Sequence, residues 1–208
     1  MQYGILKSSS NTGSDDEILI GFAAPLNIYS NQPEYIQDGL SLSRSASSQN
    51  VQRWEIEANL MPANSNANSL IHSVANGRSS IFYVRMPQIP GVVTTEGAIT
   101  CGNVNDINAQ INKNTDLLRV SSSGGLSAGE FFQFENDSKV YLVIDGGVGG
   151  NMIQFAPKLR KNVPGNTNLI LGGRVTLQCS YDVDTRLGIM FKDGILSDPG
   201  SVKLVERI

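Results

Sequence analysis

The sequence contains few of the residues that build reactive or cross-linked sites. It has two cysteines, Cys101 and Cys179, and a single histidine, His72, among 208 residues. Two distant thiols make neither a disulfide framework nor a zinc site, so we expect buried free thiols. Nothing in the pattern places a serine and an acid beside His72, as a hydrolase triad requires. We therefore expect no catalytic residue, no cofactor site and no metal site, and predict that the protein is not an enzyme.

Long apolar runs and a strong charge of one sign are also missing. No stretch of about 18 apolar residues is present to span a membrane, and the N-terminal segment lacks the apolar centre of a signal peptide. The net charge of −3 gives no general attraction to nucleic acid or to an anionic membrane, and the basic pair Arg160–Lys161 is too small to create one. We expect folding in a cytosol-like compartment, without nucleic acid and without membrane insertion.

Phosphate- and calcium-binding loops are not indicated either. The glycine-rich segment Asp145–Asn151 is followed by a strand pattern, whereas a phosphate-binding loop opens a helix. We therefore predict a hairpin tip there. The acidic segments Asp15–Glu17 and Tyr181–Asp184 lack the ligand spacing of an EF-hand, and we predict that both are solvated turns.

What the sequence does contain is a series of short strand patterns separated by turn residues. They are concentrated between Ala98 and Phe155, where turn signals recur about every 8–12 residues, a spacing typical of a small antiparallel barrel. The five patterns are AITCG, DLLRVSS, GEFFQF, KVYLVID and NMIQFAP.

Strand patterns with a period of two flank this region. Over Val51–Leu60 the apolar residues Trp54, Ile56, Ala58 and Leu60 alternate with polar ones, which indicates a half-buried antiparallel strand. Apolar residues alternate in the same way over Val175–Tyr181, and Glu17–Ala24 predicts a short strand. Ser201–Ile208 is predicted to be the last strand, and its charged residues Lys203, Glu206 and Arg207 indicate that part of it faces water.

One helix is predicted. Apolar residues of Ser65–Asn76 recur at helical spacing and form a single stripe, and Gly77 is placed to end the helix. The strand pattern Ser79–Met86 follows and is apolar on both faces, so it must be covered twice. We expect the C-terminal strand to pair with its edge and a neighbouring subunit to cover its second face.

Because the barrel pattern lies inside the chain, we predict a mainly β fold with one short helix and an inserted domain. The first domain, built from residues 1–91 and 170–208, is predicted to be a split β-sandwich or β-barrel. The second, residues 92–169, is predicted to be a small β-barrel like the oligonucleotide-binding (OB) fold. Proline and glycine residues near 87–92 and 164–173 mark the two junctions.

The aromatic residues of the inserted barrel allow two interpretations. An oligonucleotide- or sugar-binding barrel stacks its ligand on such side chains, whereas a barrel of about 60 residues needs aromatic residues for its own core. We favour core packing, because Phe132 and Phe134 share one face. The alternative function is a carbohydrate- or peptide-binding module acting through this barrel. The residues concerned are Phe131, Phe132, Phe134, Tyr141 and Phe155.

The order of these parts resembles the distal tail proteins of long-tailed bacteriophages. Three stretches carry the resemblance. The first is RWEIEANLMP followed by NANSLIHSVANGRSSIFYVRMPQ, the second is the barrel segment SAGEFFQFENDSKVYLV, and the third is the C-terminal strand ending SVKLVERI.

The resemblance implies a structural virion protein of the phage tail that is assembled in the host cytoplasm. Such proteins form a hexameric ring at the distal end of the tail tube and connect it to the tail-tip or baseplate hub proteins. The split domain makes the ring, and the inserted barrel points outward, toward side proteins or a host-surface glycan. Many strand edges fit assembly through surfaces, since exposed edges need partners.

Overall fold

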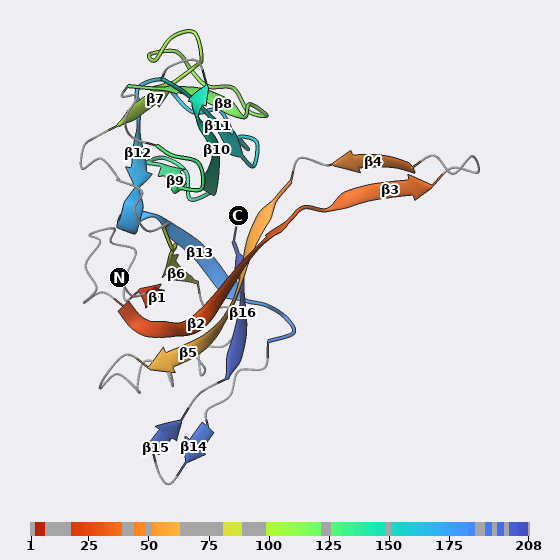
Figure 1. Cartoon of the computed structure of the whole chain (residues 1–208), viewed down its shortest axis with the longest axis vertical. Coiled ribbons are helices and arrows are strands. Elements are labelled where there is room, and N and C mark those ends of the chain that lie inside the picture. Colours follow the sequence, from red (N-terminus) through yellow and green to blue (C-terminus); the bar gives the residue numbers. More distant parts are fainter. Residues whose placement is uncertain are drawn as a thin grey trace.

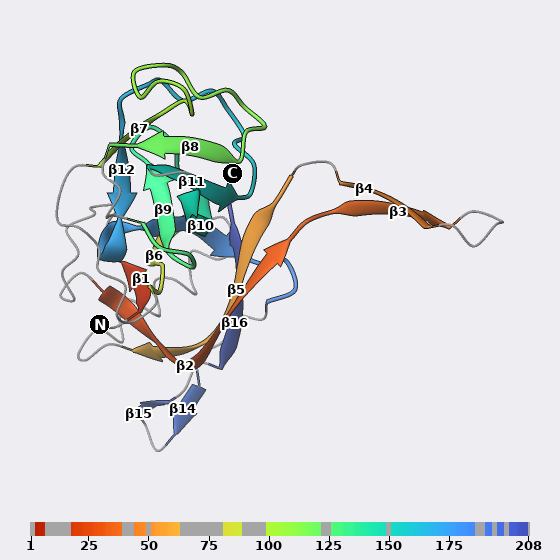
Figure 2. The ribbon, with the colours of Figure 1, turned by 45° about the horizontal axis from the view of Figure 1, so that its top comes forward.

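The chain folds into two closed antiparallel β-barrels, and a two-stranded arm projects from the first (Figures 1 and 2). The computed structural model describes residues 3–6, 18–38, 44–48, 51–62, 81–88, 99–121, 126–148, 151–185, 190–192, 195–197 and 200–207. The predicted helix at 65–76, with His72, and the acidic run at 15–17 lie outside the described residues. Within them, the only helical element is the 3-10 turn Gly172–Arg174.

The first barrel, barrel 1, takes its strands from both ends of the sequence. Its order is β1-β2-β5-β16-β13-β6, closed by the pairing of Ile5 with Val84. The predicted alternation is confirmed, because Trp54, Ile56, Ala58 and Leu60 all lie in its core. Its strands are β1 (Gly4–Leu6), β2 (Ile18–Asn31), β5 (Arg53–Pro62), β6 (Phe82–Arg85), β13 (Thr176–Tyr181) and β16 (Ser201–Glu206).

The C-terminal strand lies elsewhere in barrel 1 than predicted. β16 pairs with β5 and β13, whereas the edges of β6 pair with β1 and β13. Because β13 pairs with the edge of β6 that the C-terminal strand was predicted to occupy, the C-terminal strand lies between β5 and β13 instead. Within the single chain Phe82 and Val84 are buried, whereas Ile81, just before β6, is 49% exposed. That a neighbouring subunit covers this second face stays a prediction.

The second barrel, barrel 2, has six strands in the order β10-β11-β8-β7-β12-β9. Five of them correspond to the predicted patterns, but the sixth, β12, lies where a junction was predicted. β12 pairs with β9 and β7 and closes the barrel. The strands are β7 (Thr100–Gly102), β8 (Leu117–Val120), β9 (Phe131–Phe134), β10 (Val140–Val148), β11 (Met152–Ala156) and β12 (Thr167–Leu171).

Two further pairs of strands lie outside the barrels. β3 (Glu34–Asp38) pairs only with β4 (Arg44–Ser48) among the described residues, and together they prolong β2 and β5 into the arm (Figure 1). β14 (Met190–Lys192) and β15 (Ile195–Ser197) form a small hairpin on the side of barrel 1 away from barrel 2. The arm continues from β2, which has 14 residues and is longer than the short strand predicted at 17–24.

The prediction of a mainly β fold is confirmed by these two barrels. Barrel 2 has one strand more than the five strands of an OB-fold, and its OB-like character stays a prediction. The division into domains at 91/92 and 169/170 also stays a prediction, although the second boundary would cut β12.

Candidate functional site

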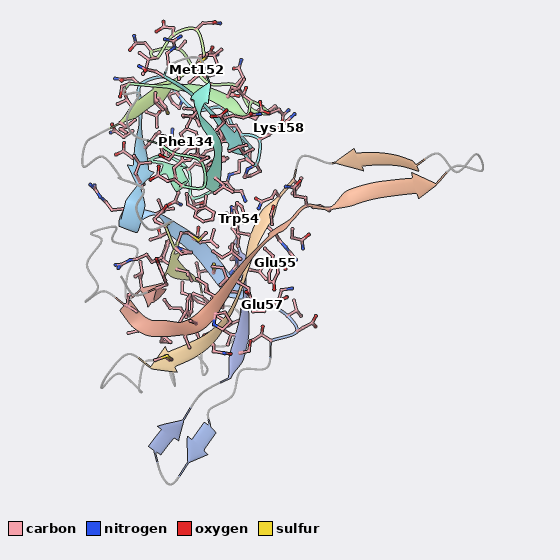
Figure 3. All side chains as sticks on the ribbon, viewed as in Figure 1. Trp54, Glu55, Glu57, Phe134, Met152 and Lys158 are labelled. Atoms are coloured by element: carbon pink, nitrogen blue, oxygen red, sulfur yellow. The ribbon has the colours of Figure 1, made fainter. Side chains whose placement is uncertain are left out.

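The candidate functional site is the contact between the two barrels, here called the joint. The outer face of β9, β10 and β12 lies against one end of barrel 1 (Figures 1 and 3). Along β10, Tyr141 and Val143 point into the core of barrel 2, while the alternate residues Val140 and Leu142 pack on the core of barrel 1. Phe131 and Ile170 join the same contact from β9 and β12.

Trp54 anchors the apolar part of the joint. Its ring meets that of Phe131 edge to face, with 5.5 Å between the ring centroids. Its Nε1 donates a hydrogen bond of 2.8 Å to the carbonyl oxygen of Val140. An indole N–H usually finds such a partner when the ring is buried, and here the partner belongs to the other barrel.

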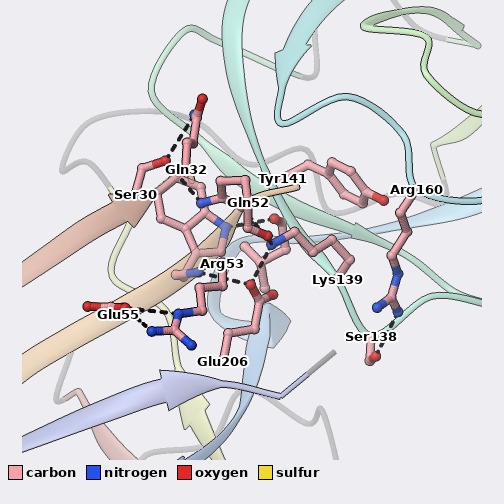
Figure 4. Close-up of polar contacts among 12 residues, drawn as sticks. Ser30, Gln32, Gln52, Arg53, Glu55, Ser138, Lys139, Tyr141, Arg160 and Glu206 are labelled. Atoms are coloured by element: carbon pink, nitrogen blue, oxygen red, sulfur yellow. Dashed lines mark hydrogen bonds and ion pairs between the residues drawn. The ribbon is translucent and has the colours of Figure 1, made fainter. Parts of the chain in front are cut away.

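Lys139 anchors the polar part of the joint (Figure 4). It immediately precedes β10 and is only 3% exposed. Its Nζ donates to the backbone oxygen of Gln52 at 2.9 Å and to Oε1 of the same residue at 2.6 Å, and it forms an ion pair with Glu206. Burial lowers the pKa of Lys139, and the carboxylate of Glu206 opposes this shift.

Part of the last strand faces water, as predicted, since Arg207 is exposed, but Glu206 does not. Its side chain is 1% exposed, and Oε2 also accepts a 2.9 Å hydrogen bond from the backbone N–H of Trp54. The side chain of Lys203, by contrast, is 36% exposed. A buried charge requires a partner, and the partner of Glu206 is supplied by a residue 67 positions away in the sequence.

Two glutamines complete the polar contacts between the barrels. The side chain of Gln88 bonds to both the N–H and the carbonyl of Phe131, at 3.2 and 3.3 Å, and donates to the carbonyl of Gly172 at 3.2 Å. It thereby brings together the points where the chain leaves and rejoins barrel 1. Gln133, from β9, accepts a 2.9 Å hydrogen bond from the N–H of Thr176 in β13.

The base of the arm is tied to the same network. The Nε2 of Gln52 donates to the Oγ of Ser30 at 3.1 Å, and the Nε2 of Gln32 donates to that oxygen at 3.2 Å.

A second polar cluster surrounds Glu55 on the outer face of barrel 1. Glu55 accepts from Asn31 at 2.7 Å and pairs with Lys203 at 2.8 Å. Burial alone would raise the pKa of Glu55, but the hydrogen bonds from Lys203, Asn31 and Arg53 outweigh it and lower that pKa to about 2.

The basic pair Arg160–Lys161 has a structural partner inside barrel 2. The Nε of Arg160 donates to the buried carboxylate of Asp137 at 3.0 Å, and Lys161 lies 3.7 Å from it. Burial alone would raise the pKa of Asp137, but Arg160 outweighs this effect and holds it below its usual value. These cations are thus engaged in an intramolecular contact.

Most of the aromatic residues singled out in the sequence form the core of barrel 2. Phe132, Phe134, Tyr141 and Phe155 are at most 1% exposed and contact one another. Phe131 is half-buried against Trp54. Four of the five rings are therefore buried in the core of barrel 2, the interpretation favoured from the sequence, and the carbohydrate- or peptide-binding alternative stays a prediction.

The remaining sequence candidates have ordinary structural places. Cys101 and Cys179 are buried free thiols, as predicted, and burial raises the pKa of Cys101 to about 12. The glycine-rich segment was predicted to be a hairpin tip. Its first part, residues 145–148, continues β10 and pairs with β11 in an antiparallel hairpin, and residues 149–150 lie outside the described residues. The described part of the chain contains no group of three potential metal ligands, and none of its helices is long and apolar enough to cross a membrane.

Comparisons with known proteins do not supply an identity. No protein-family model matches the chain, and no curated protein sequence matches it.

Proposed function

We propose that this protein is a structural component of a phage tail, a distal tail protein that forms a hexameric ring at the end of the tail tube. In this proposal barrel 1 and the arm make the ring. Barrel 2, the OB-like inserted domain, faces outward. The ring joins the tube to the tail-tip or baseplate proteins, and the protein catalyses no reaction.

The arm is the observation that carries this proposal. Both barrels are closed, so their strands already have partners on both sides over much of their length. The β3–β4 part has only two strands among the described residues, and a two-stranded sheet alone is marginally stable in water. Such an arm gains stability when a second molecule covers it, and contacts repeated from one copy to the next close into a ring.

The chemistry of the described residues agrees with a structural role. Their buried ionisable groups, including Lys139, Glu206 and Asp137, are held in contacts within the chain. The aromatic residues of barrel 2 are used in packing. These features favour a scaffold that presents surfaces over a module that binds a small ligand.

Electron microscopy of the purified full-length protein tests the proposal. We expect rings with six copies around a central opening. In a second protein, residues 33–51 are replaced by Asn-Gly, so that Gln32 and Gln52, the next positions in register after Asn31 and Arg53, flank a two-residue hairpin turn. This arm variant should fold with both barrels intact and remain monomeric.

The control changes the surface of barrel 2 instead. Ile144, 49% exposed, and the exposed Lys158 are both replaced by serine, and rings should persist because this barrel faces outward. Absence of rings in the unmodified protein would contradict the proposed ring. Rings in the arm variant would show that the ring contact lies elsewhere on the molecule.

A further inference from the structure

We propose that Lys139 and its acceptors form an orientation lock, which fixes barrel 2 and the base of the arm in one arrangement relative to barrel 1. The lock consists of Lys139 from barrel 2 and of Gln52 and Glu206 from barrel 1 (Figure 4). It is a property of the single chain and does not depend on the proposed ring.

The Nζ atom of Lys139 makes all of its hydrogen bonds within the joint. An ammonium group has three N–H donors, and this one has three acceptor oxygens, two from Gln52 and one from Glu206. All three acceptors belong to barrel 1 or to the segment just before β5. Hydrogen bonds weaken steeply when they are misaligned. Rotating barrel 2 relative to barrel 1 would therefore break several of these hydrogen bonds together.

The apolar contacts of the joint are less selective. Burial of apolar surface is roughly proportional to area and has no preferred direction. The apolar packing of Phe131, Val140 and Leu142 therefore favours a closed joint but discriminates weakly between closed arrangements.

The directional contacts are the hydrogen bonds of Lys139, of Trp54 Nε1 and of the glutamines Gln88 and Gln133. Of these, only the contact of Lys139 joins two buried charges. A buried lysine or carboxylate without its partner is costly, so any other arrangement of the barrels is penalised by the lock.

The lock also reaches the arm. Gln52 accepts from Lys139 through its carbonyl groups and donates from Nε2 to Ser30, the residue of β2 that pairs with Trp54 in the strand register. The base of the arm and barrel 2 are therefore connected through a single side chain. The direction of the arm and the orientation of barrel 2 relative to barrel 1 should therefore change together.

The lock should contribute to specificity more than to stability. Replacing a buried ion pair with uncharged side chains of similar size is often neutral or stabilising, whereas removing one partner is strongly destabilising. The informative protein is therefore the double variant Lys139→Met with Glu206→Gln. It removes both charges and keeps an oxygen to accept from the N–H of Trp54.

Distances between two spin labels measure the arrangement of the barrels in the full-length chain. The labels are placed on cysteines introduced at Lys158 of barrel 2 and at Val183, which is 71% exposed and follows β13. Cys101 and Cys179 are buried and should not react. Labelled protein is diluted with unlabelled protein, so that only pairs within one chain contribute.

We expect one narrow distance distribution in the unmodified protein. In the double variant the distribution should become at least twice as broad, without a lower melting temperature. The single indole of the chain gives a second measurement, because exchange of the Trp54 Nε1 hydrogen requires the joint to open. That exchange should be at least tenfold faster in the double variant.

Lys203→Met is the matched control, since Lys203 also makes ion pairs, with Glu55 and Asp182, but lies outside the joint. It should leave the distance distribution and the indole exchange unchanged. A double variant with the unmodified distance distribution and indole exchange would overturn the lock. A double variant that fails to fold would also overturn it, because the pair would then be needed for stability.

Discussion

Trp54 in barrel 1 donates its indole hydrogen bond to the carbonyl of Val140 in barrel 2, at 2.8 Å. The side chain of Val140 packs in the core of barrel 1, although the next residue, Tyr141, lies in the core of barrel 2. The two barrels thus share one apolar contact. This relationship changes what is expected when either barrel is altered.

The first prediction concerns removal of barrel 2. Gln88 and Gly172 are joined by a hydrogen bond of 3.2 Å, so a short Gly/Ser linker can replace residues 90–171 without straining barrel 1. All six strands of barrel 1 remain, and we expect a folded protein with a cooperative thermal transition. Because its cover is gone, Trp54 should fluoresce at longer wavelength. A remainder without cooperative melting would contradict the division into two domains.

The second prediction concerns the C-terminal strand. Deleting residues 201–208 removes three buried side chains, Val202, Leu204 and Val205, each worth about 1.5–3 kcal/mol. It also opens barrel 1 between β5 and β13 and leaves Lys139 without its carboxylate. We expect the loss to approach the whole stability of a small domain. A shortened protein that melts within a few degrees of the full-length one would show that the strand is dispensable.

The third prediction concerns the pH dependence of stability at Glu55. Its pKa in the folded protein is about 2, below the ordinary value of about 4.3. Its contribution is therefore complete above the ordinary value and is lost as the pH falls toward 2. At pH 7, Glu55→Gln should lower the free energy of unfolding by about 1 kcal/mol, because its charged partners are exposed and screened. The difference should vanish near pH 2.

Chemical denaturation of both proteins across this pH range measures the effect. Glu57→Gln is the control on the same strand, since the described residues give its carboxylate only a 3.4 Å hydrogen bond from Tyr29. A difference for Glu55→Gln that grows as the pH falls would mean that its ion pairs do not stabilise the fold.

The fourth prediction concerns two glycines in strands. A Cβ on Gly102 would overlap the backbone of Ile107, in the loop between β7 and β8, whereas one on Gly21 would meet the backbone oxygen of Met61 at an ordinary 3.6 Å. Gly102→Ala should therefore destabilise the protein by about 1–3 kcal/mol through strain. Gly21→Ala should be neutral or slightly stabilising. Equal melting temperatures for the two variants would contradict the packing of this loop.

The sequence predicts strands well where only one face is buried. The alternation from Trp54 to Leu60 and that from Val175 to Tyr181 identify β5 and β13, because their outer faces are polar. β12 gives no such signal. Leu169 enters the core of barrel 2, Ile170 packs on barrel 1, and Leu171 contacts the core of barrel 2 again, so consecutive apolar residues replace the alternation.

The joint could not be predicted from the sequence for a related reason. Lys139 is the first residue of the strand pattern KVYLVID, and Glu206 lies near the end of the last strand pattern, positions where charged residues usually face solvent. Their burial follows from the docking of two barrels whose contacting residues are far apart in the sequence. The apolar residues at 140 and 142, alternating with those at 141 and 143, are the only signal that β10 is covered on both faces.

The mass of the protein in solution shows whether this chain assembles with copies of itself. Native mass spectrometry of the purified full-length protein should show a species containing six chains of 22.4 kDa each, which the arm variant lacking residues 33–51 should not form. A single-chain mass at every concentration for the unmodified protein would contradict assembly into a ring.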